Sequence, residues 1–449
     1  MTGGLPHSRC PGSHHAGPEG RTDDEVVWGT PLHDGTSEAH FMCLPQVHAR
    51  RRRAGSVPQV PATGVQRSPA RRQLDALTLG LFTVALGTNV PTPLLLVYRR
   101  TLGLSDADIT AVFGCYAVGL IAALTVSGAA SDRFGRRAVV LPFAVLAGLV
   151  SLLFLPAADH LPLLYLGRLL QGAVSGVVFS VANAWLQDLA GPDGQRSAAT
   201  RGAVSTSLGF AIAPAMSGLL AQYGPAPTTL PYLVHVAALL VGLAALATVP
   251  ETVQGRRPGQ VLTLGLPAEA RRSFWAVLAP TAFGVFAFPT VAATLLPLLV
   301  VPQGVGVAYA GLIAGLALGA SAVAARLGRQ AERGAGPVGM VLAVAGHGIG
   351  VGAVVAGSEA LLLPAAALLG AAGGLCLTAG LTLTARLAPP HTRGAMNSAF
   401  YAIAYAGFGT PLLLASLGST LGTVPVLTGF LVVPLALAGW LARELRRRG

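Results

Sequence analysis

Few residues of this chain combine a charged side chain with a position that suggests a chemical task. Arg168 is the only charged residue well inside an apolar run, and Gln171 and Gly172 follow it closely. It lies about eight residues, or ~12 Å, from the end of that run. If the run crosses a membrane, placing a charge there costs roughly 2.5–3.5 kcal/mol, so such a residue normally faces a polar cavity and serves a function. The alternative is a structural arginine that bonds carbonyls of neighbouring helices.

The composition indicates which elements must position these residues. Hydrophobic residues make up 53% of the 449 residues, charged residues only 11%, and the mean hydropathy is +0.63. A soluble domain carries roughly a quarter of its residues as charged side chains, so an ordinary soluble enzyme is excluded and a bilayer is the natural surrounding. All basic residues are arginines, placed mainly between apolar runs and in the first 72 residues. The net charge of +12 therefore indicates membrane topology and not nucleic-acid binding.

Apolar stretches of about 20 residues, the length that an α-helix needs to cross roughly 30 Å of hydrocarbon, recur from residue 74 onward. They predict an all-α integral membrane protein with twelve transmembrane helices. Glycine and proline inside these runs are ordinary for membrane helices. The predicted spans are 74–98, 107–130, 137–157, 161–188, 198–222, 229–249, 273–301, 305–326, 336–356, 359–385, 395–418 and 422–442.

Arginine is distributed unequally between the two sets of loops. One set, together with the C-terminal end, holds nearly all arginines of the helical region, whereas the other holds only Arg99 and Arg100. The positive-inside rule then predicts a cell-membrane protein whose termini and arginine-rich loops are cytoplasmic. The arginines of that set are Arg133, Arg136, Arg137, Arg196, Arg201, Arg256, Arg257, Arg271, Arg272, Arg326, Arg329, Arg333, Arg386, Arg393, Arg443 and Arg446–Arg448.

The chain is predicted to contain two similar halves behind a polar tail. Residues 1–72 are rich in Pro, Gly, His and Arg, which predicts a disordered cytoplasmic tail or an over-extended gene start. A shift of about 197 residues places Pro192, Arg196 and Pro214 on Pro389, Arg393 and Pro411, which is typical of parallel repeats. The predicted domains are a six-helix bundle over 73–250, a cytoplasmic linker over 251–272, a second six-helix bundle over 273–443 and a basic tail over 444–449.

The polar stretch over residues 128–137 reads Gly-Ala-Ala-Ser-Asp-Arg-Phe-Gly-Arg-Arg. It resembles the loop 2/3 signature of the major facilitator superfamily, and the resemblance in helix layout covers residue 74 to the end. The resemblance implies close helix packing at the glycine and an aspartate that holds the cytoplasmic side shut through arginines and a helix N-terminus. Such a contact is worth ~0.3–2 kcal/mol, small enough to break in a transport cycle. Membrane anchoring alone would explain the arginines but not Asp132. The implied gating residues are Gly128, Asp132, Arg133, Gly135, Arg136 and Arg137.

The run Arg168-Leu-Leu-Gln171-Gly172 resembles the helix 4 signature of the same family. The resemblance implies that Arg168 takes part in proton coupling or contacts the substrate. The loop of the second half that corresponds to the loop 2/3 signature has Arg329 where the aspartate would stand. The gate is therefore expected to be asymmetric.

Residues 209–218 resemble the helix 5 signature found mainly in the exporters of the family. Gly209, Pro214 and Gly218 match it, whereas Ala213 and Ser217 replace two of its glycines. Small residues allow close backbone approach and proline bends a helix, so the resemblance implies a hinge or a seal against leakage. Ordinary small-residue packing is the alternative.

Many proton-driven exporters of the family carry an acidic residue inside helix 1, and this chain does not. Asp75 lies at the cytoplasmic edge of that helix. Proton coupling would then use Arg168 with water, Asp132, or His235 and His347, whose charge can change near physiological pH. Both histidines are more simply explained as hydrogen-bonded packing residues. The expected substrate is neutral, weakly hydrophobic or anionic.

Helices that line the centre in this family supply the cavity candidates, several of which would also suit an ordinary bundle core. These candidates are Asn89, Tyr116, Arg168, Gln171, Phe286, Thr290, Tyr401 and Tyr405. No nucleotide-binding loop or catalytic motif is visible in the sequence, so the chain is not expected to be an enzyme or to use a cofactor. No metal site is expected, and the implied energy source is the proton gradient. The expected partners are a small-molecule substrate and the lipid bilayer. Nucleic acid is not an expected partner, and the chain is expected to be a monomer.

The resemblance implies a secondary active transporter that alternates access and exports a small organic solute or drug, with proton antiport as its energy source. The first alternative is a sugar or metabolite permease, or a uniporter, of the same fold. The second alternative is a membrane sensor that binds a ligand without transporting it.

Overall fold

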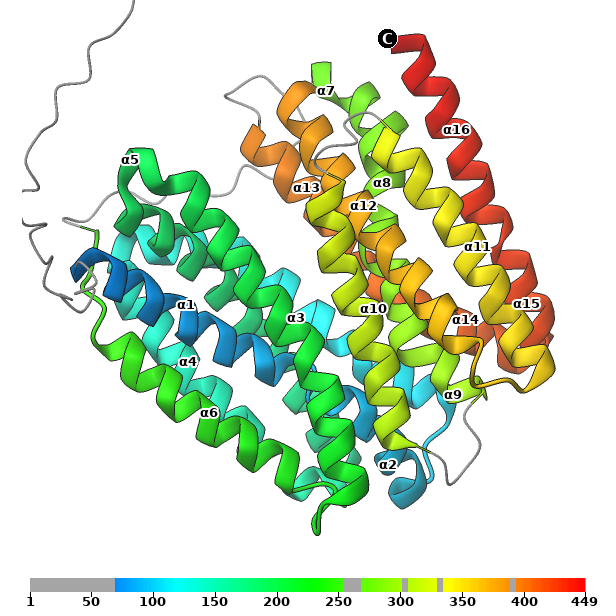
Figure 1. Ribbon diagram of the computed structural model, residues 1–449, viewed down its shortest axis with the longest axis horizontal. Coiled ribbons are helices and arrows are strands. Elements are labelled where there is room, and N and C mark those ends of the chain that lie inside the picture. Colours follow the sequence, from blue (N-terminus) through cyan, green and yellow to red (C-terminus); the bar gives the residue numbers. More distant parts are fainter. Residues whose placement is uncertain (1–68, 254–267, 301–305, 329–333, 388–392, 449) are drawn as a thin grey trace, which may run out of the picture. The chain divides into compact units, whose positions relative to one another are not determined.

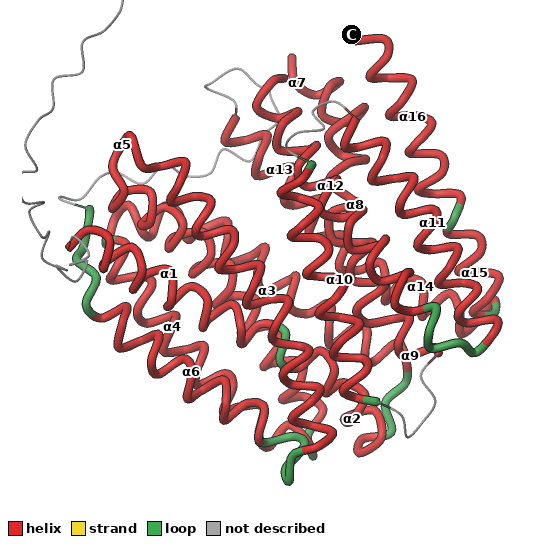
Figure 2. Tube along the Cα trace, in the orientation of Figure 1, coloured by secondary structure: helices red, strands yellow, loops and turns green. Residues whose placement is uncertain are grey.

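The computed structural model describes residues 69–253, 268–300, 306–328, 334–387 and 393–448. They all belong to one compact unit, Val65–Gly449. Every regular element within these ranges is a helix (Figures 1 and 2). The predicted all-α class is therefore confirmed.

The first half of this unit ends with α6. Its elements are α1 (Pro69–Thr88), α2 (Pro91–Leu102), α3 (Asp106–Phe134), α4 (Arg136–Leu153), the short η1 (Pro156–Ala158), α5 (Leu161–Tyr223) and α6 (Leu230–Ala247). α1 begins inside the stretch expected to be tail. The first predicted span is divided between α1 and α2, because Pro91 and Pro93 lack the N–H groups that would continue the helical hydrogen bonds.

α5 contains the predicted fourth and fifth spans in one run of 63 residues. It is not one straight helix, since Gly191 has φ 68° and ψ 176°, a backbone conformation that glycine adopts easily. The rings of Phe179 and Phe210 lie 5.4 Å apart, although a straight helix would separate them by ~46 Å. The chain therefore doubles back at Gly191, as the upper left of Figure 1 shows. Eleven helices of the described residues are long and apolar enough to cross a membrane, and the two arms of α5 raise this number to the predicted twelve.

The second half repeats this plan with more interruptions. Its elements are α7 (Ala268–Ser273), η2 (Phe274–Leu278), α8 (Ala279–Thr290), η3 (Val291–Leu295), α9 (Leu296–Val300), α10 (Val307–Leu327), α11 (Ala335–Ala356), α12 (Leu362–Leu387), α13 (Arg393–Ala406), η5 (Gly407–Gly409), α14 (Thr410–Leu421), α15 (Thr423–Phe430) and α16 (Val432–Arg448). η2 and η3 are π-helical turns on either side of α8. Such turns are frequent at functional sites.

The internal repeat is visible in the packing of glycines. On α5 and again on α12, two glycines four residues apart meet backbone atoms of a neighbouring helix, so no side chain would fit there. The contacts join Gly172 to Tyr116, Gly176 to Leu120, Gly370 to Ala317 and Gly374 to Ser321. Because the two pairs lie about 198 residues apart, they support the repeat predicted at about 197 residues.

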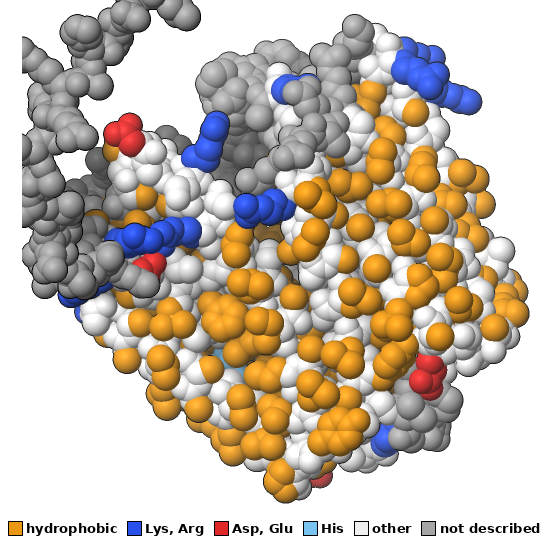
Figure 3. Space-filling model, in the orientation of Figure 1, with side chains coloured by type: hydrophobic (Ala, Val, Ile, Leu, Met, Phe, Trp, Pro, Cys, Tyr) orange, Lys and Arg blue, Asp and Glu red, His pale blue; other side chains and the backbone are white. Residues whose placement is uncertain are grey.

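The surface separates apolar from charged side chains. In the view of Figure 3, apolar side chains cover the middle of the molecule, and most of the visible arginines lie toward the end where α5 turns and α16 ends. We call this end, which includes Arg136, Arg196 and Arg201, the arginine-rich end, and the end with Arg99 and Arg100 the opposite end. Arg256, Arg257, Arg329 and Arg333, and the side chains of Arg393 and Arg448, lie outside the described residues.

Candidate functional site

The break between α1 and α2 leaves backbone carbonyl groups that can accept hydrogen bonds from the buried polar residues of α5. In a regular helix the N–H of residue 91 would bond Gly87 O, but Pro91 has no N–H, and Thr92 N bonds Asn89 O instead of Thr88 O. Gly87 O accepts a long backbone hydrogen bond from Val90 N, at 3.4 Å, so the carbonyls of Gly87 and Thr88 can still accept from other donors. Unsatisfied carbonyls inside a membrane are costly, so a polar side chain must approach them.

Arg168 and Gln171 are the side chains that approach. Arg168 Nη1 donates to Thr88 O at 3.0 Å and to Gln171 Oε1 at 2.6 Å, and Gln171 Nε2 donates to Gly87 O at 2.7 Å. Arg168 Nη2 lies 3.5 Å from Phe113 O. Arg168 is 1% exposed, and no acidic side chain among the described residues pairs with it. Its Nε has no hydrogen-bond partner there either.

Aromatic rings complete the surroundings of this cation. The Arg168 guanidinium carbon lies 5.1 Å from the ring centres of both Phe113 and Tyr116, within range of a cation–π interaction. Gly172 makes this possible, because its lack of a side chain lets α5 touch the backbone of α3 at Tyr116. Arg168 thus has the carbonyl contacts of a structural arginine, and it also keeps an unpaired donor beside two rings.

These two rings continue into the second half of the molecule. Phe408 lies 5.5 Å from Phe113 and 5.7 Å from Tyr116, and its other neighbours are Phe286 at 4.9 Å and Tyr405 at 6.1 Å, between ring centres. We call these five residues the central aromatic cluster. It joins α3 to α8 and to the interrupted helix α13–η5–α14. Phe408 lies in η5 between Gly407 and Gly409.

The structure brings most of the predicted cavity residues together. Tyr116, Phe286 and Tyr405 belong to the central aromatic cluster, and Tyr401 stacks on Tyr405 at 6.1 Å. Asn89 and Thr290 instead bond within their own segments, through Thr92 Oγ1 to Asn89 Oδ1 and Thr290 Oγ1 to Phe286 O. Sequence reasoning missed Phe113 and Phe408. The glycines on both sides of Phe408 were a usable signal, because they mark an interrupted helix.

Two of the three predicted helix 5 residues, Pro214 and Gly218, lie where the two halves meet. Gly209 packs against α1, whereas Pro214 O and Gly218 contact α10 at Gly311 and Val307. α5 and α10 are in close contact from Gly218 to Gly315 and lie further apart at Gly319, toward the arginine-rich end. A Cβ at Gly218 would lie 2.6 Å from Val307 O, one at Gly315 2.7 Å from Ala211 O, and one at Gly319 3.7 Å from the Cβ of Ala211.

Other contacts between the halves also lie near the opposite end. Arg99 Nη1 donates to Leu298 O at 3.3 Å, and Ala308 N donates to Gln222 Oε1 at 3.0 Å. In this state the halves are therefore closed at the opposite end. Pro214 and Gly218 form part of that closure.

The predicted gating residues form a network inside the first half. Arg136 pairs with Asp132 at 2.8 Å and with Asp188 at 3.1 Å, and it also donates to Ser131 Oγ. Arg133 lies over the ring of Phe134. No described atom lies within 4 Å of a Cβ at Gly128, so the close packing implied there is not present in this state.

Glu251 is a member of this network that sequence reasoning missed. Its two carboxylate oxygens accept from Arg136 N and Arg137 N, each at 2.9 Å, which are the first amides of α4. Partial burial would raise the pKa of this carboxyl, but backbone N–H groups, including those of Val253, Arg136 and Arg137, outweigh burial and lower the pKa. Gly135, with φ 103°, brings the backbone against the carboxylate. The position of Glu251 directly after the sixth apolar run was the available signal.

Each buried histidine bonds to backbone. His235 Nε2 lies 3.1 Å from Thr83 O, and its Nδ1 lies 2.7 Å from Ser151 Oγ, so both ring nitrogens have partners. His347 Nε2 lies 3.0 Å from Leu427 O, whereas its Nδ1 has no partner among the described residues. These contacts favour packing roles. Within the described residues no group of three His, Cys, Asp or Glu side chains is arranged to hold a metal ion.

Two packed halves of membrane-length helices around a buried polar centre define the class of transporter-like polytopic membrane proteins. The family model of the Major Facilitator Superfamily matches residues 77–409, more than half of the chain. The chain therefore belongs to the Major Facilitator Superfamily. Members of this family are transporters and not enzymes, which confirms the prediction that the chain is not an enzyme.

Relatives and solved structures agree with this assignment. The chain is 25% identical over 158 residues to the bacillibactin exporter of Bacillus subtilis, covering 34% of this chain and 39% of the exporter. It is 24% identical over 153 residues to the quinolone resistance protein NorA of Staphylococcus aureus, covering 34% and 39%. The matched stretches thus span about two fifths of these relatives.

The fold resembles a bacterial homologue of the human lysosomal transporter Spinster in an inward-facing, unoccupied conformation. The TM-score is 0.68 at 16% identity, covering 85% of this chain and 98% of the other. At this identity the likeness shows the fold. It confirms the predicted two-bundle architecture.

Proposed function

We propose that this chain is a secondary active transporter that exports a small organic solute by alternating access, works as a monomer and draws its energy from the proton gradient. The observation that carries the proposal is Arg168, an unneutralised cation that is 1% exposed and contacts rings shared by both halves. A buried charge in a membrane helix is expensive and marks a functional site. The exporter relatives and the helix 5 residues at the contact between the halves favour the outward direction.

The proposed orientation follows from the arginines. By the positive-inside rule the arginine-rich end faces the cytoplasm of a cell-membrane protein, and both termini lie on that side. The contacts of Arg99, Gln222 and Gly218 would then close the outer side. In this orientation the structure is the state that receives solute from the cytoplasm.

The roles proposed for the polar residues follow from their contacts. Arg168, with its unpaired Nε, would attract an anionic or hydrogen-bonding group of the solute, and the central aromatic cluster would hold its apolar part. Asp132 is 38% exposed and bonds only to its neighbour Arg136 among the described residues. It is therefore available to a partner from the second half when the cytoplasmic side closes.

One observation favours a uniporter or metabolite permease as the second candidate. The acidic side chains that the structure describes lie at helix ends or in loops, so none is placed at the depth of Arg168. A carboxylate that carries the proton would then have to be Asp132 or another acidic group near a helix end. The two candidates differ in whether solute movement is accompanied by proton flux.

Internal pH in proteoliposomes with an imposed proton gradient separates these functions. Lipophilic, sugar and carboxylate solutes are added to wild type, Arg168→Ala and Asp132→Asn, with Arg100→Gln as an exposed control from the opposite end. We expect one solute class to release protons from wild type and the control but not from the other two variants. Solute movement without proton flux would favour the uniporter. Ligand binding without movement of any solute would contradict transport and favour a sensor.

A further inference from the structure

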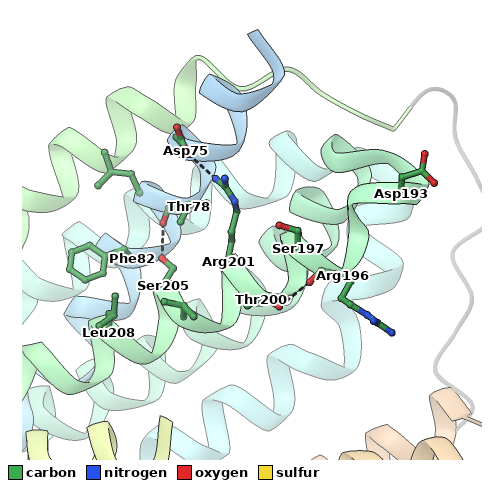
Figure 4. A pocket seen from close by; sticks show the side chains of 12 residues that line it. Asp75, Thr78, Phe82, Asp193, Arg196, Ser197, Thr200, Arg201, Ser205 and Leu208 are labelled. Carbon is green, nitrogen blue, oxygen red and sulfur yellow. Dashed lines mark hydrogen bonds and ion pairs between the residues drawn. The ribbon is translucent and has the colours of Figure 1, made fainter. Parts of the chain in front are cut away.

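A cavity with charged walls lies away from the central aromatic cluster. It opens at the arginine-rich end between α1 and the second arm of α5, and its volume is about 860 Å³ (Figure 4). Sites for small organic molecules usually measure about 300–1,000 Å³, so one such molecule fits. None of the roles proposed above uses this cavity.

The walls of the cavity are chemically divided. Leu79, Phe82, Val204 and Leu208 form an apolar wall, and three of them are 39–50% exposed. The other wall carries the hydroxyl groups of Thr78, Ser197, Thr200 and Ser205 and the charges of Asp75, Asp193, Arg196 and Arg201. Such a cavity suits an amphiphile, which has a polar head and an apolar body.

The two arginines differ in their partners. Arg201 Nη1 pairs with Asp75 Oδ1 at 2.7 Å, and both side chains are 34% exposed, so water and solutes reach this pair. Arg196 is exposed, and among the described residues its guanidinium forms no ion pair with a carboxylate; Figure 4 shows it directed away from Asp193 and from the Asp75–Arg201 pair. A bound anion would therefore meet Arg201, which it can share with Asp75, while Arg196 adds positive charge at the edge of the cavity.

The cavity lies on the face of α5 that contacts the second half. Ser197, Arg201, Val204 and Leu208 follow one another at helical spacing. The same stripe continues into Ala211 and Gly218, which contact α10. A molecule in the cavity therefore lies beside the contact between the halves, on the side where α5 and α10 separate.

We propose that this cavity binds an organic anion with an apolar body, and that Arg201 exchanges Asp75 for the anionic head. The body lies against Leu79, Phe82, Val204 and Leu208, and Arg196 adds the second positive charge. In an exporter this would be a loading site on the cytoplasmic side, and only this assignment rests on the proposed function. Solute anions and anionic lipid headgroups share this chemistry.

Binding of decanoate to the purified full-length chain tests the proposal by isothermal titration calorimetry. Decanol is the neutral probe, and Arg100→Gln is the control for loss of an exposed arginine. We expect Arg201→Gln to weaken decanoate binding ~10-fold or more, since a charge-assisted hydrogen bond is lost. Asp75→Asn should strengthen decanoate binding severalfold, because it leaves Arg201 without its competitor. Decanol binding should respond to neither variant.

The two substitutions break the same ion pair, so opposite effects on binding distinguish ligand recognition from a merely structural pair. Equal weakening by Arg201→Gln and Asp75→Asn would overturn the proposal, as would decanoate binding no tighter than decanol. Thermal unfolding of each variant checks that the chain is folded. No gradient is present, so failure of transport leaves this result intact, and absence of binding leaves the proposed transport untouched.

Nanodiscs distinguish the two sources of the anion. Decanoate is titrated into wild type and Arg201→Gln in phosphatidylcholine discs with and without phosphatidylglycerol. Competition by phosphatidylglycerol in wild type but not in Arg201→Gln would support an anionic lipid as the ligand. Decanoate binding that is unaffected by phosphatidylglycerol would support a solute anion.

Discussion

Replacing Gly218 by alanine should shift the equilibrium between the two states of the molecule. Three backbone atoms of α10 surround the missing side chain, and the closest, Val307 O, would lie 2.6 Å from the new Cβ. An ordinary carbon–oxygen contact is about 3.3 Å, so the helices must separate by about 0.7 Å where the halves are closed. Overpacking costs about 1–3 kcal/mol. Because only the state closed at this end pays that cost, the equilibrium should move about 5- to 150-fold toward the other state.

Spin labels at Thr101→Cys and Thr420→Cys, both exposed and in the two halves, report this shift as a distance distribution in a background without native cysteines. We expect Gly218→Ala to increase the population with the longer distance. Gly319→Ala is the matched control on the same interface, because its Cβ would lie 3.7 Å from its nearest neighbour, an ordinary contact. If Gly218→Ala leaves the distribution unchanged, or if Gly319→Ala shifts it equally, the steric argument is refuted.

Three further predictions concern stability and sealing. Gly135→Ala should lower the free energy of unfolding by about 1–3 kcal/mol, because Gly135 has φ 103° and the Glu251 carboxylate occupies the space of the new Cβ. Gly103→Ala is the control and should lower the free energy of unfolding less, because Gly103 has φ 64° and open space around the new Cβ. Thermal unfolding measures both. The pKa of Glu251 is lowered in the folded state. The stabilisation from this carboxylate is therefore complete above the ordinary pKa of 4.5 and is lost as the pH falls through the lowered pKa. Acidification should reduce the Tm of wild type more than that of Glu251→Gln. Phe408→Ala should make proteoliposomes leak an imposed proton gradient faster, because it removes the ring that joins Phe113 and Tyr116 to the second half. The control Phe179→Ala should not increase leakage, because the Phe179 ring contacts Phe210 within the first half. Equal leakage from both variants would contradict a sealing role for Phe408.

Helix number and the place of Arg168 could be predicted from the sequence, because both depend on local patterns. An apolar run of about 20 residues is visible without any knowledge of its neighbours, and so is a charge inside it. The reversal at Gly191 lies between the fourth and fifth predicted spans, where a loop was expected, because polar residues separate the two apolar runs there.

Contacts between distant segments could not be predicted in the same way. Arg136 binds Asp188 and Glu251, which lie 52 and 115 residues away. In the sequence Asp188 and Glu251 resemble ordinary charged residues at helix ends. Only the folded chain brings them to Arg136. The same holds for Phe408, whose partners come from three helices. Thr290 was predicted to line the cavity, but its hydroxyl donates a hydrogen bond to Phe286 O one turn earlier in the same helix. A polar residue in a central helix therefore does not have to face a cavity.

Arg168 is hydrogen-bonded to the first half and is linked to the second half through aromatic rings. Its hydrogen bonds go to Thr88, Phe113 and Gln171, all in the first half, so the guanidinium moves with that half. The rings of Phe113 and Tyr116 contact the guanidinium and also Phe408.

Opening of the opposite end in the proposed transport cycle would withdraw Phe408 from both rings and expose them to water. The desolvated cation would then lose part of its surroundings while its hydrogen bonds remained. A ligand held by Arg168 would therefore have a different affinity in the two states, which is the condition for any ligand to shift a conformational equilibrium. The central aromatic cluster is thus the element through which ligand binding at Arg168 and closure of the opposite end would influence each other.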